Sequence, residues 1–431
     1  MGQLTGLIIF LLIVAFLLRI DFIFYVVYVC IGVYAWSRWY TPRAFARLTG
    51  QRSFTDHAFR GEEVMVTLHI GNPNRLTIPW VQINESIAPH LRQNKLVADV
   101  ISLQGRETAV LTYPIKAAQR GFYKLGPLRL STSDLFGLMP EQQAYLPPDF
   151  ITIYPRITPL SQLGLPSRLP FGTVASRQRL FEDPARPMGV RNYHSGDSPR
   201  QINWKVSAHA QQLVVKTLEP AISLETAVLL NLHTDDYQRR DRATYTEWGI
   251  EIAASCASHL VNQRQPVGLI TNGIDPLLKQ TGTGELDFDE TSGRLLRQAG
   301  NNGNKTALIP PMILPRNGRA HLMKILERLA RIEADETIPL TDWLPTACLN
   351  LSWGITILVI TPRGDEATCH GLHRLVRSGF NPVLIAIEPD YNFGLVRERA
   401  QRLGFAAYNI TQTRDMDQWK RPLRGKPATS M

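Results

Sequence analysis

Apolar residues dominate the first forty positions of the chain. Between Leu4 and Trp36 the only charged residues are Arg19 and Asp21. A single helix over this run would be about 50 Å long at ~1.5 Å per residue, too long for a hydrocarbon core of ~30 Å unless it tilts strongly. Two shorter helices joined at the charged pair fit that core better. The pattern therefore predicts a transmembrane helical hairpin over residues 1–40, with one tilted span or a buried core hairpin as alternatives.

The pattern changes to a period of two between residues 53 and 155. Apolar and polar residues alternate from Glu62 to Ile70, as expected for a half-buried strand. Further short apolar segments follow, each bounded by turn residues such as Gly71 and Pro73, and none has a helical period. Short strands with turn signals between them predict an antiparallel, immunoglobulin-like β-sandwich over residues 53–155.

Strands and amphipathic helices alternate over residues 221–420, and a short polar tail follows at 421–431. This alternation predicts a doubly wound α/β domain with a mostly parallel sheet. The predicted strands are Glu225–Asn231, Pro266–Thr271, Gly354–Thr361 and Pro382–Ile387, and the predicted helices are Tyr245–Asn262, Ala320–Glu333, Leu340–Leu349, Glu366–Ser378 and Phe393–Leu403.

Composition narrows the class of protein. Hydrophobic residues make up 44% of the chain and charged residues 19%, which is an ordinary globular mixture. The formal net charge of +10 is spread thinly, so we expect no nucleic acid as a partner. The four cysteines lie far apart, which predicts reduced thiols in place of a disulfide framework or zinc site.

Basic residues directly follow the apolar region, and no acidic residue intervenes before Asp56. By the positive-inside rule, this flank lies in the cytoplasm. We therefore expect the folded parts to face the cytoplasm from an inner (plasma) membrane, with the lipid bilayer as a partner. The basic residues are Arg38, Arg43, Arg47 and Arg52, and the aromatic residues expected at the interface are Trp36, Trp39 and Tyr40.

The loop Asp134–Leu138 allows two interpretations. Asp134 can accept backbone N–H groups in an Asx-turn, and Phe136 and Leu138 can then close one end of the β-sandwich. The alternative is a docking loop for a partner. The turn is the simpler interpretation, because its residue types explain it without a ligand.

The densest group of polar and aromatic residues lies within a motif segment at 180–220. Gly196 permits a sharp turn, and Asp197 is placed to cap a helix whose first turn holds Pro199. One interpretation is a charged surface for a partner or a phosphate group. The other is a capped helix with an internal pair of Arg200 and Asp197. No nucleophile–base pair is visible, so we predict no catalytic residues.

The segment carries the pattern Arg-x-Tyr-x-x-Gly-Asp-x-x-Arg-x-Ile-x-Trp-Lys from Arg191 to Lys205. This pattern resembles the DUF58 family of bacterial and archaeal membrane proteins. The resemblance also covers the order of parts, from two N-terminal spans to a C-terminal domain similar to von Willebrand factor A. It implies a prokaryotic membrane protein of a family that is often found with MoxR-type AAA+ ATPases and whose biochemical activity is largely undefined. The motif positions, which are also the candidate partner-binding residues, are Arg191, Tyr193, Gly196, Asp197, Arg200, Ile202, Trp204 and Lys205.

The resemblance to von Willebrand factor A domains raises the question of a metal site. In those domains Asp-x-Ser-x-Ser after the first strand holds a divalent cation. Here Asn231 stands at the Asp position, His233 at the first Ser and Asp235 at the second, with Asp236 next to them. Hard cations prefer carboxylate and hydroxyl oxygen, so we expect no metal and no other cofactor.

Two functions from different classes follow. The first is a membrane-anchored, non-enzymatic scaffold or adaptor that binds protein partners, including a MoxR-type AAA+ ATPase, in the assembly or maturation of other complexes. The second is a metal-dependent hydrolase that uses the loop after the first strand of the α/β domain. The absence of a visible catalytic set favours the first.

Overall fold

The structure is a computed structural model of the whole chain. Its contacts divide the chain into two compact units. The N-terminal unit comprises Met1–Pro155 and Gln280–Gln298, and the C-terminal unit comprises Arg156–Lys279 and Ala299–Met431. The described residues are 6, 9–10, 13–14, 16–17, 21–91, 98–136, 140–158, 182–194, 199, 202–220, 225–279, 288–289, 295 and 308–410.

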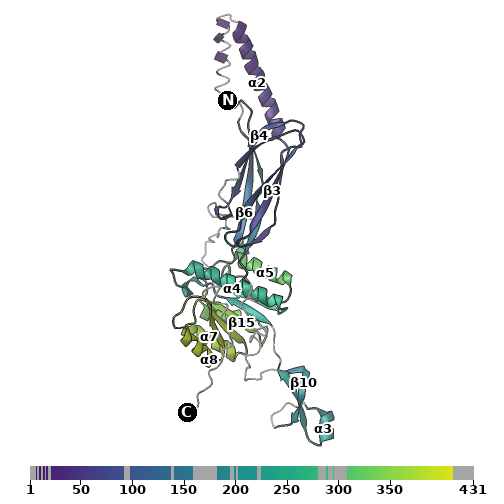
Figure 1. Cartoon of the computed structure of the whole chain (residues 1–431), viewed down its shortest axis with the longest axis vertical. Helices are drawn as coiled ribbons and strands as arrows, with labels where there is room; N and C mark the ends of the chain where they lie inside the picture. Colours follow the sequence, from purple (N-terminus) through teal and green to yellow (C-terminus); the bar gives the residue numbers. More distant parts are fainter. Residues whose placement is uncertain are drawn as a thin grey trace. The chain divides into compact units, whose positions relative to one another are not determined.

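Helix α2 (Asp21–Phe45) forms the second predicted membrane segment (Figure 1). Residues Phe22–Phe45 are long and apolar enough to cross a membrane, and only 11% of their most apolar stretch is buried. A core helix of a soluble protein would bury far more of its apolar surface. The first predicted helix and the turn of the hairpin lie mostly outside the described residues, so the hairpin stays a prediction.

The rest of the N-terminal unit is a β part built from two sheets. One sheet has the order β1-β3-β6, and the other has the order β2-β9-β7-β4-β5, with β8 also paired to β7. The strands are β1 (Thr49–Ser53), β2 (His57–Phe59), β3 (Glu63–Gly71), β4 (Ile78–Ile87), β5 (Ala98–Leu103), β6 (Thr108–Lys116), β7 (Gly121–Thr132), β8 (Gln142–Leu146) and β9 (Asp149–Tyr154).

Alternation along the strands places one face of each sheet in a shared core. Val66 of β3 belongs to the same hydrophobic cluster as Tyr123 of β7 and Ile153 of β9, and all three are buried. The prediction of purely antiparallel strands was wrong at one edge, because β2 pairs with β9 in parallel. No hairpin joins these two strands, so their direction is not fixed by a tight turn.

The C-terminal end of α2 is part of the core of the β part. Ala44 and Phe45 are buried in a cluster with Ile78 and Val81 of β4. The Tyr40 hydroxyl donates to the carbonyl of Thr77 at 2.7 Å. The helix therefore runs from its exposed apolar stretch directly into a folded domain, without a linker.

The loop after β7 differs in part from its prediction. Asp134 is buried, and its Oδ2 accepts the N–H of Phe136 at 3.2 Å, which confirms the Asx-turn. The expectation that Phe136 closes the end of the domain was wrong, because its side chain is 62% exposed. The turn directs Phe136 outward. Leu138 lies outside the described residues.

A six-stranded sheet forms the centre of the C-terminal unit, in the order β14-β13-β12-β15-β16-β17. All neighbours are parallel except β14, which is antiparallel to β13. The strands are β12 (Thr226–Leu230), β13 (Val267–Thr271), β14 (Ile313–Arg316), β15 (Thr356–Thr361), β16 (Asn381–Ala386) and β17 (Ala406–Asn409), and the helices are α4 (Arg242–Asn262), α5 (Arg319–Arg331), α6 (Leu340–Ala347), α7 (Glu366–Arg377) and α8 (Phe393–Leu403).

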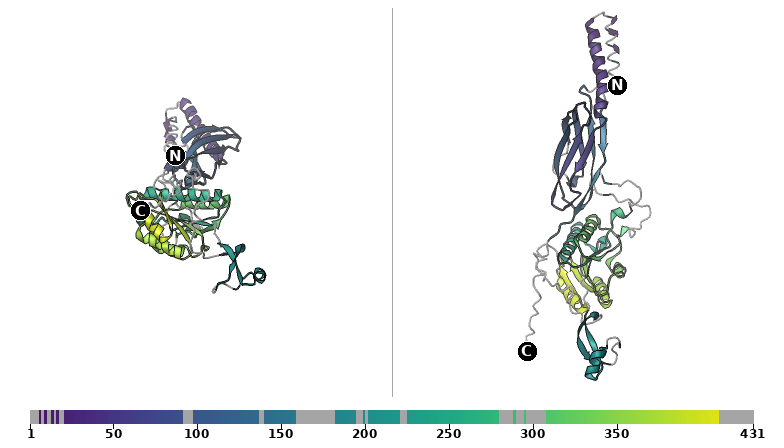
Figure 2. Two further views of the ribbon diagram at one scale, coloured as in Figure 1. Left: turned by 60° about the horizontal axis from the view of Figure 1, so that its bottom comes forward. Right: turned by 90° about the vertical axis from the view of Figure 1, so that its right-hand side faces the viewer.

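Helices cover both faces of this sheet (Figure 2). Helices α6, α7 and α8 share a hydrophobic cluster with one set of strand residues, including Leu229 and Val359. The opposite face meets α4, where Gly249 lies against Leu230 and Ile360. The predicted strands and helices of this part are confirmed, while β14 and β17 were not predicted.

Candidate functional site

The motif segment forms a small folded module. Strands β10 (Glu182–Asn192) and β11 (Val214–Pro220) are antiparallel, and helix α3 (Trp204–Ala210) precedes β11. Hydrogen bonds tie the helix to the strand. The Ser207 hydroxyl accepts the N–H of Val214 at 2.9 Å, and the N–H of Asn203 donates to the carbonyl of Val214 at 2.8 Å. The module is therefore held together by its backbone and by Ser207.

The helix of this module begins later than predicted. Ile202 forms a β-bridge with Val215, so it does not belong to a helix. The helix begins at Trp204, and its cap is Asn203, whose Oδ1 accepts the N–H of Val206 at 3.4 Å. Pairing with β11 holds Ile202 in an extended conformation, which explains the delay. Asp197, the cap predicted from sequence, lies outside the described residues, as do Gly196 and Arg200.

Several motif residues lie on the surface of the module. Trp204 is 67% exposed, and Lys205 beside it is exposed. Tyr193 is half-buried, and its N–H donates to the carbonyl of Leu213 at 2.9 Å. Among residues 189–194, 199 and 202–216, where side chains are described, every charged group is basic. These groups are Arg191, Lys205 and Lys216.

Arg191 lies next to His194 at the end of β10. Its Nη1 is 3.2 Å from the Nδ1 of His194 and donates to the carbonyl of Asn192 at 3.2 Å. The same Nδ1 also lies 3.1 Å from the carbonyl of Asn192, so it accepts from Arg191 in one tautomer and donates to that carbonyl in the other. The imidazole therefore supports the position of Arg191, and Ser195, the neighbouring hydroxyl residue, lies outside the described residues.

Asn231 is the centre of a second polar cluster, at the end of β12. It is fully buried, and its Nδ2 donates to Asp236 Oδ2 at 2.8 Å and to Thr361 Oγ1 at 3.2 Å. Its Oδ1 accepts from the N–H of His233 at 3.1 Å and from Asn272 Nδ2 at 2.8 Å. The side chain of Asn231 therefore uses its whole hydrogen-bonding capacity within the protein.

The other metal candidates are likewise engaged with the protein or the solvent. The Nδ1 of His233 accepts the N–H of Thr337 at 3.1 Å. Asp235 is exposed and lies 3.3 Å from the Nη2 of Arg242. Within the part of the chain that the structure describes, no group of three or more His, Cys, Asp or Glu residues could hold a metal ion. The residues present do not fit a divalent cation, because an amide fills the place of the expected carboxylate.

A buried carboxylate that sequence reasoning missed lies at the end of β16. Glu388 is 0% exposed, and its Oε1 accepts the N–H of Gln238 at 2.8 Å while its Oε2 accepts Arg363 Nε at 2.6 Å. Burial and the charges of Glu388 and Asp236 raise the pKa of Tyr237. The signal that could have found Glu388 is a single acidic residue directly after the apolar strand at 382–387.

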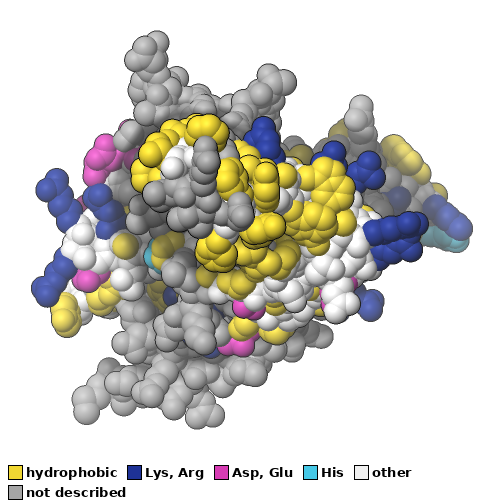
Figure 3. Space-filling view, turned by 90° about the horizontal axis from the view of Figure 1, so that it is seen from above, with side chains coloured by type: hydrophobic (Ala, Val, Ile, Leu, Met, Phe, Trp, Pro, Cys, Tyr) yellow, Lys and Arg dark blue, Asp and Glu magenta, His cyan; other side chains and the backbone are white. Residues whose placement is uncertain are grey.

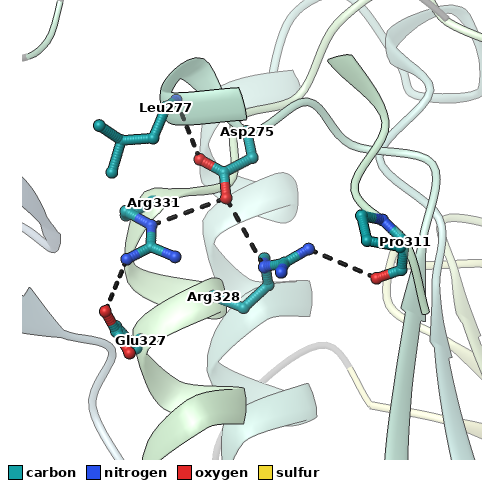
Figure 4. A network of polar contacts seen from close by, with 6 residues as sticks. All are labelled: Asp275, Leu277, Pro311, Glu327, Arg328 and Arg331. Atoms are coloured by element: carbon teal, nitrogen blue, oxygen red, sulfur yellow. Dashed lines mark hydrogen bonds and ion pairs between the residues drawn. The ribbon is translucent and has the colours of Figure 1, made fainter. Parts of the chain in front are cut away.

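A third polar cluster follows β13 (Figure 4). Asp275 is buried, and its Oδ2 is 3.6 Å from the Nε atoms of both Arg328 and Arg331. The Oδ1 of Asp275 accepts the N–H of Leu277 at 3.1 Å, and Arg328 Nη1 donates to the carbonyl of Pro311 at 3.4 Å. The cluster therefore fixes the chain on both sides of residues 280–307 to α5.

Comparisons with known proteins agree with the motif segment. The model of "Protein of unknown function DUF58" matches residues 189–285. A curated relative, "Uncharacterized protein YeaD" from Bacillus subtilis, is 24% identical over 131 residues, which cover 30% of this chain and 33% of that protein. The chain therefore aligns with about a third of the length of this relative.

Solved structures give only weak similarity. The CARDB domain of the PF1109 protein from Pyrococcus furiosus matches with a TM-score of 0.19 and 16% identity, over 25% of this chain and 92% of that chain. A beta-glucosidase from Listeria innocua matches with a TM-score of 0.16 and 12% identity, over 25% of this chain and 16% of that chain. Scores this low give no information on fold or function. The comparisons thus show that residues 189–285 are similar to the DUF58 family.

Proposed function

We propose that this protein is a membrane-anchored, non-enzymatic adaptor of the DUF58 type. It binds protein partners, including a MoxR-type AAA+ ATPase, through its motif segment, and serves the assembly or maturation of other complexes. The observation that carries the proposal is the exposed Trp204 with Lys205 and Arg191 on a module in which the hydrogen bonds among described residues leave out the Trp204 and Lys205 side chains.

Trp and Arg are the residue types that contribute most to protein interfaces. Exposure of the apolar tryptophan ring to water is unfavourable in free energy, and binding in a pocket of a partner removes the ring from water. Val190 of β10, at 50% exposure, and Leu213 directly before β11, at 46% exposure, add apolar surface to the same module. The basic charge of the described side chains favours an acidic partner surface.

The anchor in this proposal is α2. Its apolar residues are exposed, and Arg43 and Arg47 follow at its C-terminal end. The positive-inside rule then orients both units toward the cytoplasm of a prokaryote, on the inner membrane. The expected hairpin over residues 1–40 would give the chain a second span.

The proposal includes a finer description of the two folded parts. The β part is an immunoglobulin-like sandwich, which the clusters shared by its two sheets support. The C-terminal unit is a doubly wound domain similar to von Willebrand factor A. Its strand order, numbered from β12, is 3-2-1-4-5-6, the order of doubly wound folds in which the two halves diverge from the first strand. No observation on the described residues favours the alternative of a metal-dependent hydrolase.

Affinity capture with the full-length protein tests the proposal. Detergent extracts of cells that express the wild type, Trp204→Ala or Leu395→Ala are purified by the same tag, and bound AAA+ ATPase is quantified. Leu395 of α8 is 62% exposed, so Leu395→Ala controls for the loss of an exposed apolar side chain. Wild type and control should recover the ATPase, and Trp204→Ala should recover at least about tenfold less, as expected for loss of ~1.4 kcal/mol or more.

If Trp204→Ala recovers as much ATPase as the wild type, the motif segment is not the binding surface. Recovery of no ATPase by the wild type would remove the partner assignment. Circular dichroism and thermal melting of Trp204→Ala provide the fold control. The variant should melt like the wild type, because the Trp204 side chain is mostly in solvent.

A further inference from the structure

One end of the β part lies directly beside the C-terminal end of α2. Asn74, in the turn after β3, donates through Nδ2 to the carbonyl of Ala44 at 2.9 Å. Thr77, just before β4, accepts from the hydroxyl of Tyr40. Arg106, in the turn before β6, donates its N–H to the carbonyl of Asn74 at 2.9 Å. These contacts define what we call the α2 end of the β part.

Aromatic residues near the C-terminal end of α2 lie next to the α2 end of the β part. Trp36 contacts Trp39 and Tyr40 with ring centroids 5.7 and 5.6 Å apart, and the guanidinium of Arg43 lies 5.0 Å from the centre of the Trp39 ring. Trp36 is 60% exposed. Exposed Trp and Tyr at the end of an apolar helix are typical of the boundary between lipid and water.

The loop after β7 reaches the same α2 end and carries two exposed apolar side chains. Thr132, the last residue of β7, donates through Oγ1 to the carbonyl of Trp80 at 2.5 Å, three residues from Thr77. Leu135 is 69% exposed and Phe136 is 62% exposed. The buried Asp134 holds this turn through the N–H of Phe136. Two adjacent exposed apolar side chains form a small apolar patch, which is the kind of surface that a lipid or protein partner covers.

Basic side chains lie at the end of α2 and on the turns at the same end of the β part. They lie on the last turn of α2, directly after it, on the turn that contacts it and on the turn beside that one. The acidic groups nearby are the buried Asp134, Glu107 and Glu141, the last 3.7 Å from Arg129. Hydrophobic side chains gather in one area of the face seen in Figure 3. The exposed basic residues are Arg43, Arg47, Arg75 and Arg106.

We propose that the α2 end of the β part is a lipid-binding surface that rests on an anionic bilayer. Leu135 and Phe136 insert at the interface, and Arg75 and Arg106 contact lipid phosphates. The proposal rests on the proposed membrane anchor, because α2 brings this end to the bilayer. Continuity with the interfacial aromatic residues of α2 is the reason to choose lipid over a protein as the occupant.

Site-specific fluorescence quenching in proteoliposomes tests this surface. The full-length protein is labelled in detergent with an environment-sensitive thiol probe and then reconstituted in phosphatidylcholine with phosphatidylglycerol. Cys256, Cys348 and Cys369 are buried, so in the wild type the probe reacts at Cys30 of α2 and reports on the anchor. In a Cys30→Ser background, Leu135→Cys moves the probe to the loop tip.

Met65→Cys in the same background is the matched control. Met65 is 55% exposed on β3, six residues from the α2 end, which is about 20 Å at ~3.3 Å per residue. We expect doxyl-labelled lipid to quench the probes at positions 30 and 135 and leave the probe at 65 unaffected. Aqueous iodide should quench the probe at 65 at least several-fold more than the probe at 135.

The outcomes separate this proposal from the anchor. If doxyl lipid quenches the probe at position 30 and iodide quenches the probe at position 135, the anchor stands and the lipid-binding surface is overturned. A probe at 135 that neither quencher reaches would mean that protein, such as a second copy of the chain, covers the loop, and would also overturn it. No lipid quenching at 30 would overturn the anchor itself.

A charge reversal tests the electrostatic part. Arg75→Glu should reduce lipid quenching of the probe at 135, and Lys116→Glu, an exposed site at the other end of β6, should leave it unchanged. Pure phosphatidylcholine vesicles should have the same effect as Arg75→Glu, because the attraction to anionic lipid is lost. Unchanged quenching in both cases would overturn the role of the basic residues.

Discussion

His259 lies on the buried face of α4, with its Nε2 3.0 Å from the Nε2 of Gln263. Burial lowers the pKa of His259 from its ordinary value, because the charged imidazolium loses its hydration. A depressed pKa means that the unfolded chain binds the proton more readily than the folded one. Stability contributed by neutral His259 is therefore present above the unfolded pKa of about 6.5 and is lost as pH falls below it.

We predict that His259→Leu reduces the loss of thermal stability between pH 7 and pH 5. The measurement is the unfolding midpoint of the purified protein across this range. His370→Gln is the control, because the His370 side chain is 60% exposed on α7, and it should keep the wild-type pH dependence. A His259→Leu profile as steep as the wild type would contradict the prediction.

The polar cluster around Asn231 shows which contacts could not be predicted from the sequence. The replacement of the expected Asp by Asn231 argued against a hard cation, and the structure shows the Asn231 side chain hydrogen-bonded to Asp236 and Asn272. Its partners Asn272 and Thr361 come from other strands, far away in the chain. No local spacing pattern places them together, and the same holds for Glu388. Buried hydrogen-bond partners from distant segments depend on strand order, which periodicity alone does not give.

At the scale of elements, Arg52 of β1 links the two sheets of the β part. Its side chain is 1% exposed, and its Nε donates to Glu85 Oε1 of β4 at 2.8 Å. Its Nη1 donates to Asp149 at the start of β9 at 2.8 Å. Burial raises the pKa of Glu85, and the charge of Arg52 opposes this rise. Glu85 is therefore a buried carboxylate, and within the described residues Arg52 is the cation that pairs with it.

We predict that Arg52→Met destabilises the β part by about 3–5 kcal/mol, because Glu85 stays buried without its partner. The pKa of Glu85 then rises further, so the loss is larger at pH 8 than at pH 5, where the carboxyl takes up a proton. Arg402→Met removes an exposed pair with Glu398 and should change stability by less than ~0.5 kcal/mol. Unfolding monitored at both pH values measures both variants, and equal losses would contradict the role of Arg52.

Periodicity predicted the elements with long patterns and missed those that depend on pairing. The amphipathic helix at 245–262 and the apolar strand at 354–361 match α4 and β15 closely. Strand β14 was missed because its four residues carry no clear apolar run. Helix α3 was placed too early, since the bridge between Ile202 and Val215 outweighs the local helical pattern.

At the scale of the whole molecule, α2 carries the proposed membrane anchor and contributes Ala44 and Phe45 to the core of the β part. We predict that a chain beginning at Thr41 leaves the membrane fraction and keeps its fold, because Ala44 and Phe45 still fill the core. A chain beginning at Gly50 loses both side chains and should melt lower, by the equivalent of several kcal/mol. Carbonate extraction followed by thermal melting measures both effects. Retention of the Thr41 chain in the membrane would contradict the anchor.

The division of the chain into units has a practical consequence for dissecting it. Gln280–Gln298 belongs to the N-terminal unit, although both neighbouring stretches belong to the other. Within this stretch the ring of Phe288 stacks on Phe150 with centroids 5.6 Å apart and lies 6.2 Å from Phe122. A recombinant fragment cut after Pro155 would strip Phe288 of both aromatic neighbours. Cleavage of the chain at one position therefore does not separate the two units. A fragment designed to contain only the C-terminal unit also needs residues 280–298 replaced by a linker.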